Sequence, residues 1–326
     1  MMQRLMIRGA LALSVMATAA VSAQEIVPED VPVVPRPAEI MPMASKSLLL
    51  DVTFNGGQYV AVGERGHILA STDGENWAQV NVPVRSPLTA ITFNGDTHGW
   101  AVGHDGVILG STDGGKTWVL QNFDPDDEFP LQFLDVHFVD QQRGFAIGTY
   151  GLMMETRDGG LNWEPSDAPA IRDEELHFNA MVPLNDGSLL LVGETGMMGR
   201  STDGGESWER LESPYESSLF GAAAHGDSGA VVYGLRGNVF ATTDVAAGEW
   251  RRLDTGTVAS FFGGDRLPDG GYVMVGLNGT ILTVDAAAQE VRRSSDPEGK
   301  PLAGVTPIAD GLLVVGQGGA NVISQR

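Results

Sequence analysis

A turn bounded by two glycines recurs through the chain, and this repeat restricts the fold more than any other feature. Each copy reads Gly-x-x-Gly, and neighbouring copies lie 40 to 45 residues apart. Their first glycines are Gly63, Gly103, Gly148, Gly193, Gly234, Gly276 and Gly316. A period of this length is typical of a propeller blade or of a helical repeat, and the residues around the turn decide between them.

The second copy shows the repeating unit most clearly. Residues 88–93, 99–103 and 106–111 are apolar or alternate with a period of two, as β-strands do, and an acidic turn ending in Trp118 follows them. Tryptophans repeat in step with the glycines at Trp77, Trp118, Trp163, Trp208 and Trp250. The 3.6-residue period of helices is missing. The repeat therefore predicts an all-β fold, a seven-bladed β-propeller of four-stranded antiparallel blades.

The two ends of the chain bear on how the ring closes. The seventh copy stops soon after its third strand, residues 320–324, and so lacks a fourth. We expect residues 40–47 to supply that strand, because joining the two ends removes exposed sheet edges. The expected domains are a signal peptide at 1–23, a proline-rich extended segment at 24–39, and the propeller at 40–326.

The first 23 residues predict export. Arg4 and Arg8 precede a short apolar run, and a small-x-small sequence ends at Ala23, where we expect cleavage. The run is too short for a permanent membrane helix, so we predict a periplasmic protein without direct membrane insertion. The chain has no cysteine, which excludes disulfides, thiolate metal sites and a lipidated cysteine.

The net charge limits the partners. A formal charge of −22 repels nucleic acid, so we expect no nucleic-acid partner. The acidity is explained either by solubility alone or by a cationic partner. By itself the chain is expected to be monomeric.

The acidic turns resemble the Asp-box of bacterial neuraminidase-type repeats. Residues 111–118 read Ser-Thr-Asp-Gly-Gly-Lys-Thr-Trp, and residues 201–208 read Ser-Thr-Asp-Gly-Gly-Glu-Ser-Trp. The box aspartates, Asp73, Asp113, Asp158 and Asp203, occur once per blade, too far apart for one catalytic or metal site. We expect them to bond their own turn backbone while the tryptophan packs between sheets. The histidines show no metal-ligand spacing, and we predict no metal site and no cofactor.

Together with the preceding Gly-Trp-Ala-Val-Gly strand at 99–103, the box makes the unit similar to the photosystem II stability and assembly factor family, over about residues 48–324. The resemblance implies a non-catalytic scaffold that docks on a membrane-protein complex as an assembly factor or accessory subunit. In non-photosynthetic bacteria it implies association with inner-membrane exporters of the resistance-nodulation-division type. Photosynthetic members of the family use arginines on one propeller face, and only Arg65 and Arg236 match them here.

The middle residues of the Gly-x-x-Gly turns are the predicted partner-binding site. In a four-stranded blade these turns open on the face that also carries the connections to the next blade, around the central channel. The predicted site residues are Glu64, Arg65, His104, Asp105, Tyr150, Glu194, Arg236 and Asn278. Exposed turns are commonly polar in any protein, so that explanation stays open. Two acidic connections, residues 124–129 and 172–175, should border the same face.

The alternative function is a sialidase-like glycoside hydrolase or a carbohydrate-binding propeller. Sialidase chemistry needs three arginines on a carboxylate, a tyrosine nucleophile with its glutamate, and an acid. Arg65, Arg236, Tyr150 and Glu194 supply part of this set, but a third arginine has no equivalent position. The tryptophans belong to box ends or, at Trp100, to an inner strand, which disfavours sugar stacking. We therefore predict no catalytic residues.

Overall fold

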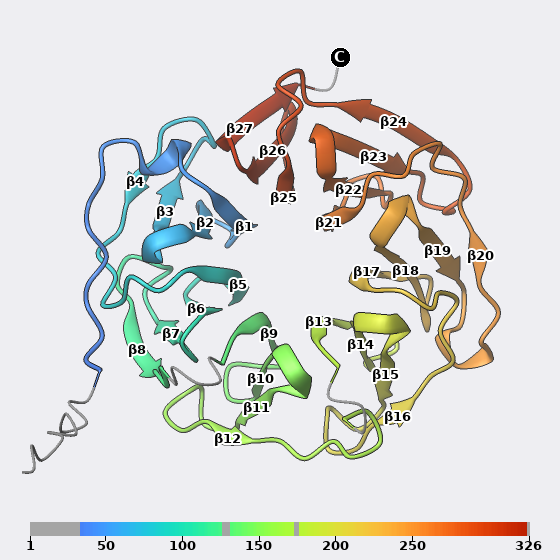
Figure 1. The fold of residues 1–326 in the computed structure, drawn as a ribbon, viewed down its shortest axis with the longest axis horizontal. Coiled ribbons are helices and arrows are strands. Elements are labelled where there is room, and N and C mark those ends of the chain that lie inside the picture. Colours follow the sequence, from blue (N-terminus) through green and yellow to red (C-terminus); the bar gives the residue numbers. More distant parts are fainter. Residues whose placement is uncertain (1–32, 126–130, 173–175, 325–326) are drawn as a thin grey trace, which may run out of the picture. The chain divides into compact units, whose positions relative to one another are not determined.

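Antiparallel sheets account for nearly all of the regular structure. The computed structural model describes residues 33–125, 131–172 and 176–324, and in them strands form seven sheets, six of four strands and one of three. The chain divides into two units, Met1–Val34 and Pro35–Arg326, and all seven sheets belong to the second. The predicted seven-bladed β-propeller is confirmed (Figure 1).

Each sheet is one blade, and its strands follow each other along the chain. Blades 1 to 3 consist of β1 (Leu49–Phe54), β2 (Tyr59–Gly63), β3 (Ile68–Ser71), β4 (Ala78–Gln79); β5 (Leu88–Asn94), β6 (His98–Gly103), β7 (Ile108–Ser111), β8 (Val119–Asn122); and β9 (Phe133–Phe138), β10 (Gly144–Gly148), β11 (Met153–Thr156), β12 (Glu164–Pro165). Blades 4 and 5 consist of β13 (Phe178–Pro183), β14 (Leu189–Gly193), β15 (Met198–Ser201), β16 (Glu209–Arg210); and β17 (Leu219–His225), β18 (Gly229–Gly234), β19 (Val239–Thr242), β20 (Arg251–Arg252). Blades 6 and 7 consist of β21 (Phe261–Arg266), β22 (Tyr272–Gly276), β23 (Thr280–Val284), β24 (Val291–Ser295); and β25 (Leu302–Ile308), β26 (Gly311–Gly316), β27 (Gly319–Ser324). Short 3-10 helices connect them: η1 (Ala44–Lys46), η2 (Glu64–Gly66), η3 (Thr149–Gly151), η4 (Glu194–Gly196), η5 (Leu235–Gly237), η6 (Val245–Ala247) and η7 (Leu277–Gly279).

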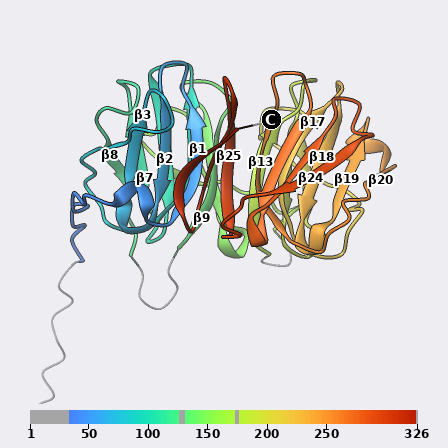
Figure 2. The same cartoon turned by 90° about the horizontal axis from the view of Figure 1, so that it is seen from above.

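The blades form a closed ring. The first strand of each blade lies nearest the centre and contacts the first strand of the next, all the way round to the contact of β25 with β1 (Figures 1 and 2). The second strands lie between two neighbours in their sheet and between two blades. Those of blades 3 and 4, β10 and β14, are therefore buried along their whole length, which explains their unbroken apolar sequence.

The acidic turns bind their own backbone, as the sequence predicted. In blade 2, Ser111 Oγ donates to Asp113 Oδ1 at 2.9 Å and accepts the backbone N–H of Gly115 at 2.9 Å. Asp113 Oδ1 also accepts the backbone N–H of Thr117 at 2.9 Å. The side-chain and backbone hydrogen bonds from Thr117 lower the pKa of Asp113 to about 2. Trp118 donates from Nε1 to Gly115 O at 3.0 Å and packs in the core between blades 1 and 2.

The prediction that residues 40–47 form the fourth strand of blade 7 is wrong. Residues 40–47 form a turn and η1, which packs against β27, while the described part of blade 7 has three strands. Pro42 has no N–H to give to a ladder, and Ser47 Oγ bonds Ala44 O at 2.7 Å, which favours the short helix. Ser45 and Lys46 nevertheless lie against Gly319, as Val84 and Arg85 of the blade 1 to 2 connection lie against Gly66. The segment thus replaces a connection between blades instead of a strand.

The predicted signal peptide, with its cleavage near Ala23, lies outside the described residues, as do residues 24–32 of the proline-rich segment. Residues 33–39 form neither helix nor strand, and Ala38 N donates to Val82 O at 3.0 Å. Within the described ranges, no helix has the length and apolar character needed to cross a membrane.

Candidate interaction face

The Gly-x-x-Gly turns lie around the inner strands on one face of the ring. Each connects the second and third strands of its blade, and five of them touch the first strand of the next blade: η2 on β5, η3 on β13, η4 on β17, η5 on β21 and η7 on β25. All the predicted site residues lie in these turns, and the turns form a ring on this face. We call it the turn face.

Each turn needs glycine at its first position, because the backbone that leads into the first strand of the same blade passes very close to it. A Cβ on Gly103 would collide with the carbonyl oxygen of Pro87, at the entry to the first strand of the same blade, and Gly63 meets Leu48 in the same way. The sequence pattern therefore has a steric cause. Only a residue without a side chain lets the turn fold over the start of its own blade.

The second middle residue of the turn is held in an unfavourable backbone conformation. In six turns it has a φ of 51° to 59°, the left-handed region, although none of the six is glycine: Arg65, Asp105, Tyr150, Thr195, Arg236 and Asn278. Asn and Asp tolerate this region, but for arginine, tyrosine or threonine it costs about 1–2 kcal/mol. Stability alone would favour glycine or asparagine. Strain retained at such positions points to side chains kept for function. Sequence reasoning missed this strain, because the Gly-x-x-Gly pattern does not show which residue of the turn has a positive φ.

One group of side chains bridges two blades on this face. The ring of Tyr150, 69% exposed, stands edge-on to the ring of His177 with centroids 4.9 Å apart. His177 Nδ1 lies 3.6 Å from Glu194 Oε2, and the backbone N–H of His177 donates to the same oxygen at 3.4 Å. Tyr150 and Glu194 were predicted site residues, whereas His177 was not. Its position just before the first strand of blade 4 was the available signal.

The glutamates also have a structural task. Glu64 N donates to Leu48 O at 3.0 Å while Leu48 N donates to Glu64 Oε1 at 3.3 Å, and Glu194 forms the same reciprocal pair with His177. In both blades the carboxylate fixes the residue that leads into the first strand. Glu64 and Glu194 therefore stabilise the turn face as well as adding charge to it.

The two predicted arginines lie on different blades, 1 and 5. Arg65 Nη1 lies 3.7 Å from Met41 Sδ and lines a hollow of about 300 Å³ together with Glu39, Met41 and Arg85. Arg85, from the connection between blades 1 and 2, is a second cation that sequence reasoning missed. The backbone N–H of Arg236 donates to Ser260 Oγ at 3.1 Å.

The remaining predicted residues contribute mainly to the local fold. Asp105 Oδ2 accepts Ser86 Oγ at 2.5 Å, and His104 pairs with Gln132 in an isolated bridge. Asn278 holds the left-handed position in η7. The two acidic connections fall partly outside the described residues, which leave out 126–130 and 173–175. Their described ends are Asp124, whose N–H donates to Asp105 O, and Arg172, whose Nη1 donates to Ser166 O.

The central channel is lined by carboxylates that join neighbouring blades. Asp51 accepts Ile91 N at 2.9 Å, Asp135 accepts Met181 N at 2.8 Å, and Asp265 accepts Thr306 Oγ1 at 3.0 Å. The inner strands of all seven blades surround a cavity of about 390 Å³. Burial raises the pKa of Asp51 to about 7 and that of Asp135 to about 6, and it raises the pKa of Asp265. No group of three or more metal-ligating side chains occurs within the described ranges.

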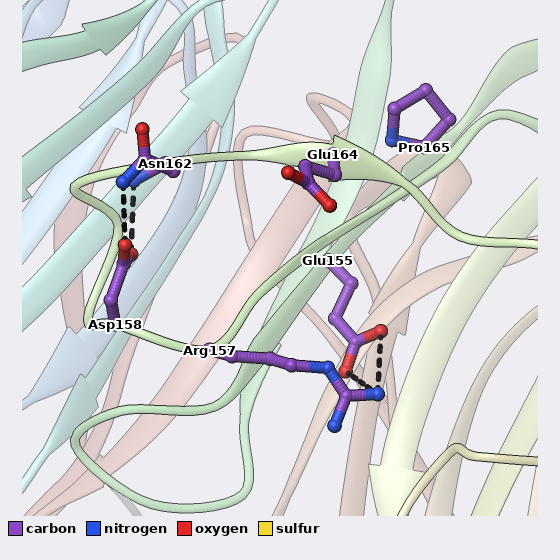
Figure 3. Close-up of a pocket in the computed structure, with 6 residues that line it drawn as sticks. All are labelled: Glu155, Arg157, Asp158, Asn162, Glu164 and Pro165. Carbon is purple, nitrogen blue, oxygen red and sulfur yellow. Dashed lines mark hydrogen bonds and ion pairs between the residues drawn. The ribbon is translucent and has the colours of Figure 1, made fainter.

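A further hollow lies at the acidic turn of blade 3 (Figure 3). Asp158 Oδ2 accepts Asn162 Nδ2 at 2.7 Å inside the turn. Arg157 approaches Glu155 at 3.0 Å and binds Glu206 of blade 4 through both Nη atoms, at 2.8 and 2.9 Å. Arg157 thus forms ion pairs that connect blades 3 and 4. We therefore assign the hollow to the packing of the two blades.

The partial sialidase set is not brought together. Tyr150 and Glu194 both contact His177 between blades 3 and 4, while Arg65 belongs to blade 1 and Arg236 to blade 5. Carboxylate recognition by clustered arginines needs them to converge on one group. The turns and their geometry instead define the class of protein: a seven-bladed β-propeller with Asp-box turns and a face of displayed side chains.

Comparison with known proteins gives the family. The family model described as photosynthesis system II assembly factor YCF48 matches residues 69–134 and 126–299, more than half of the 326 residues. The chain belongs to this family, as the acidic turns and glycines predicted.

Two curated relatives are chloroplastic photosystem II stability/assembly factors named HCF136. The chain is 41% identical over 71 residues to that of Guillardia theta and 32% identical over 104 residues to that of Cyanidioschyzon merolae. These alignments cover 20% and 29% of this chain, and only 18% and 24% of the relatives' lengths.

Solved structures agree on the fold. A YCF48 bound to D1 peptide has a TM-score of 0.66 at 17% identity, covering 90% of this chain and 100% of the other. YCF48 from Cyanidioschyzon merolae has a TM-score of 0.66 at 18% identity, covering 86% and 96%. The WD40 propeller domain of Doa1 has a TM-score of 0.68 at 12% identity, covering 90% and 97%. The shared fold therefore does not distinguish assembly factors from other propellers.

Proposed function

We propose that the protein is a non-catalytic periplasmic scaffold that binds a membrane-protein complex through the turn face. The family consists of assembly factors, and one related propeller has been solved with a D1 peptide bound. Such a protein needs a rigid ring and an exposed face with chemically varied side chains. Both are present in this chain.

One observation carries the proposal: arginine and tyrosine side chains occupy left-handed backbone positions on one face. Arg65, Tyr150 and Arg236 each keep a conformation in which glycine would be more stable. Tyr150 is 69% exposed, and no hydrogen bond of its hydroxyl group is found among the described residues. Exposed tyrosine and arginine are the residue types that most often anchor protein interfaces.

The partner we propose is an inner-membrane complex such as an exporter of the resistance-nodulation-division type. The predicted signal peptide supports this, because an exported protein meets such complexes from the periplasmic side. The Arg65–Arg85 pair is positive on a strongly acidic molecule, so it would select an acidic segment of the partner.

The test is an affinity pull-down from detergent-solubilised membranes. The wild type is compared with a triple variant, Arg65→Glu, Tyr150→Ala and Arg236→Glu. We expect the wild type to recover one inner-membrane complex and the variant to lose it, because reversed charges and a missing aromatic anchor weaken an interface strongly.

Arg252→Glu is the matched control. Arg252 is exposed on β20, the outermost strand of blade 5 and away from the turns, so the same charge reversal should leave recovery unchanged. All variants must have the same melting temperature. Recovery of no membrane protein by the wild type, or equal recovery by the triple variant, contradicts the proposal. Turnover of a sialoside by the wild type would instead favour the hydrolase alternative.

A further inference from the structure

Within the described residues, no strand lies beside the outer edge of β27 in blade 7. Its described part has three strands, whereas every other blade has a fourth, which in blades 1, 3, 4 and 5 is only two residues long. In the antiparallel register Gly316 pairs with Gly319 across a two-residue turn. In such a pair the backbone N–H and C=O groups of the two residues form hydrogen bonds with each other. The alternation then turns the backbone groups of Ala320, Val322 and Ser324 outward. Lys46 Nζ lies 3.5 Å from Ala320 O, whereas the outward backbone groups of Val322 and Ser324 have no hydrogen-bond partner among the described residues; we call these two residues the open edge.

A hollow adjoins this edge. It has a volume of about 660 Å³ and lies between the outer strands of blade 6 and the last two strands of blade 7. Ile281 of β23, Leu312 of β26 and Ile323 of β27 form its apolar wall, with Leu267. We call the hollow and the open edge together the blade 7 groove.

Blades 1 to 5 show what occupies the equivalent place, whereas blade 6 has its fourth strand without a tryptophan before it. Between blades 1 and 2, Trp118 packs against Val60 and Ile68 of one blade and Leu109 of the next. Equivalent layers contain Trp77, Trp163, Trp208 and Trp250. In each case the tryptophan comes directly before a fourth strand. The layer between blades 6 and 7 contains no aromatic residue among its described members, and the sequence has none after Tyr272.

We propose that the blade 7 groove binds an extended segment of a partner protein, which pairs with β27 as a fourth strand and places an aromatic side chain in the hollow. Main-chain hydrogen bonds to Val322 would give affinity, and the hollow would give specificity, as in other cases of strand addition. This proposal does not depend on the turn face, since the groove is at the outer edge of the ring.

Charge and composition select the occupant. Asp269, Asp285 and Glu290 line the groove with only Arg292 in opposition, so a basic segment fits it. The chain's own residues 1–47 contain no aromatic side chain, and residues 24–32 carry three carboxylates and two prolines. They lack both the anchor and the charge, and proline weakens a strand. The proposed occupant is therefore a basic, aromatic-containing segment of another protein.

The chain itself supplies the probe. A peptide amide with the sequence of residues 114–122, Gly-Gly-Lys-Thr-Trp-Val-Leu-Gln-Asn, labelled at its N-terminus with an uncharged fluorophore, reproduces the tryptophan and fourth strand of blade 2 and carries one positive charge, that of its lysine. Its binding to the purified protein is measured by fluorescence anisotropy. We expect saturable binding that weakens about tenfold when the peptide's tryptophan is replaced by alanine.

Two protein variants locate the binding. Val322→Pro removes the outward N–H, and Ile323→Arg places a charge in the hollow; each should weaken the wild-type peptide about tenfold or more. The matched control is Arg252→Pro in β20, at the position where β12 already has Pro165, and it should not change binding. Absence of saturable binding, or binding equal in wild type and Val322→Pro, overturns the proposal. A dimer in light scattering that Val322→Pro dissociates also overturns it, because the occupant would then be a second copy.

Discussion

Replacement of Trp118 by alanine tests whether the box tryptophans hold neighbouring blades together. The side chain is 6% exposed, its Nε1 bonds Gly115 O at 3.0 Å, and its ring meets that of Phe93 edge-on with centroids 6.2 Å apart. The substitution leaves a cavity in the layer between blades 1 and 2 and removes these contacts.

The expected loss is about 4 kcal/mol in the free energy of unfolding, since removing a buried tryptophan typically costs about 3–5 kcal/mol. For a domain of this size each kcal/mol lowers the melting temperature by about 2–4 °C, so a decrease of roughly 8–16 °C should follow.

The assay is equilibrium unfolding in urea, followed by circular dichroism because the mutation removes a fluorophore. Val119→Ala is the control, since Val119 is the next residue but is 66% exposed, and its change should stay within about 0.5 kcal/mol. A loss below about 1 kcal/mol for Trp118→Ala, or one equal to that of the control, would refute the idea that the tryptophan layer holds the blades together.

Three further outcomes follow from the glycines and carboxylates. Gly103→Ala should cost about 3 kcal/mol in urea unfolding, because its Cβ meets the backbone of Pro87, and a neutral effect would contradict the steric reading. Burial raises the pKa of Asp51 to about 7. The contribution of the protonated Asp51 to stability is therefore complete below about pH 4 and is lost as the pH rises to 7. The Asp51→Asn variant should show a flatter dependence of melting temperature on pH in this window. Because hydrogen bonds lower the pKa of Asp113 to about 2, its contribution is present above about pH 4 and lost toward pH 2; acid unfolding monitored by circular dichroism should be less steep in Asp113→Asn.

The sequence was sufficient for the fold because the restrictions on it are local and repeated. Gly103 must be glycine to pass the backbone of Pro87, and Asp113 must accept hydrogen bonds inside its own turn. The glycine requirement appears in every copy and the aspartate requirement in four of the seven, so both can be counted without coordinates. The number of blades and the position of the turn residues followed directly.

Contacts between distant parts of the chain were beyond the same reasoning. The failure of residues 40–47 to form a strand depends on how η1 fits over Gly319, and no local pattern contains that fit. Similarly, His177 joins Tyr150 and Glu194 only because two blades are adjacent. The left-handed φ of Tyr150 was also hidden, since its sequence neighbours predict a turn but not which residue takes the strain.

The contact of Lys46 with Ala320 spans 274 positions of the chain and has a consequence for how the molecule is made. The inner strand of blade 1 packs between the inner strands of blades 2 and 7. It gains the second of these neighbours only when blade 7 has been made. During synthesis, which proceeds from the amino terminus, the first blade therefore waits with one flank exposed for nearly the whole time of translation. We expect closure to be the last and slowest step of folding, because bringing the two ends together requires the longest loop in the protein.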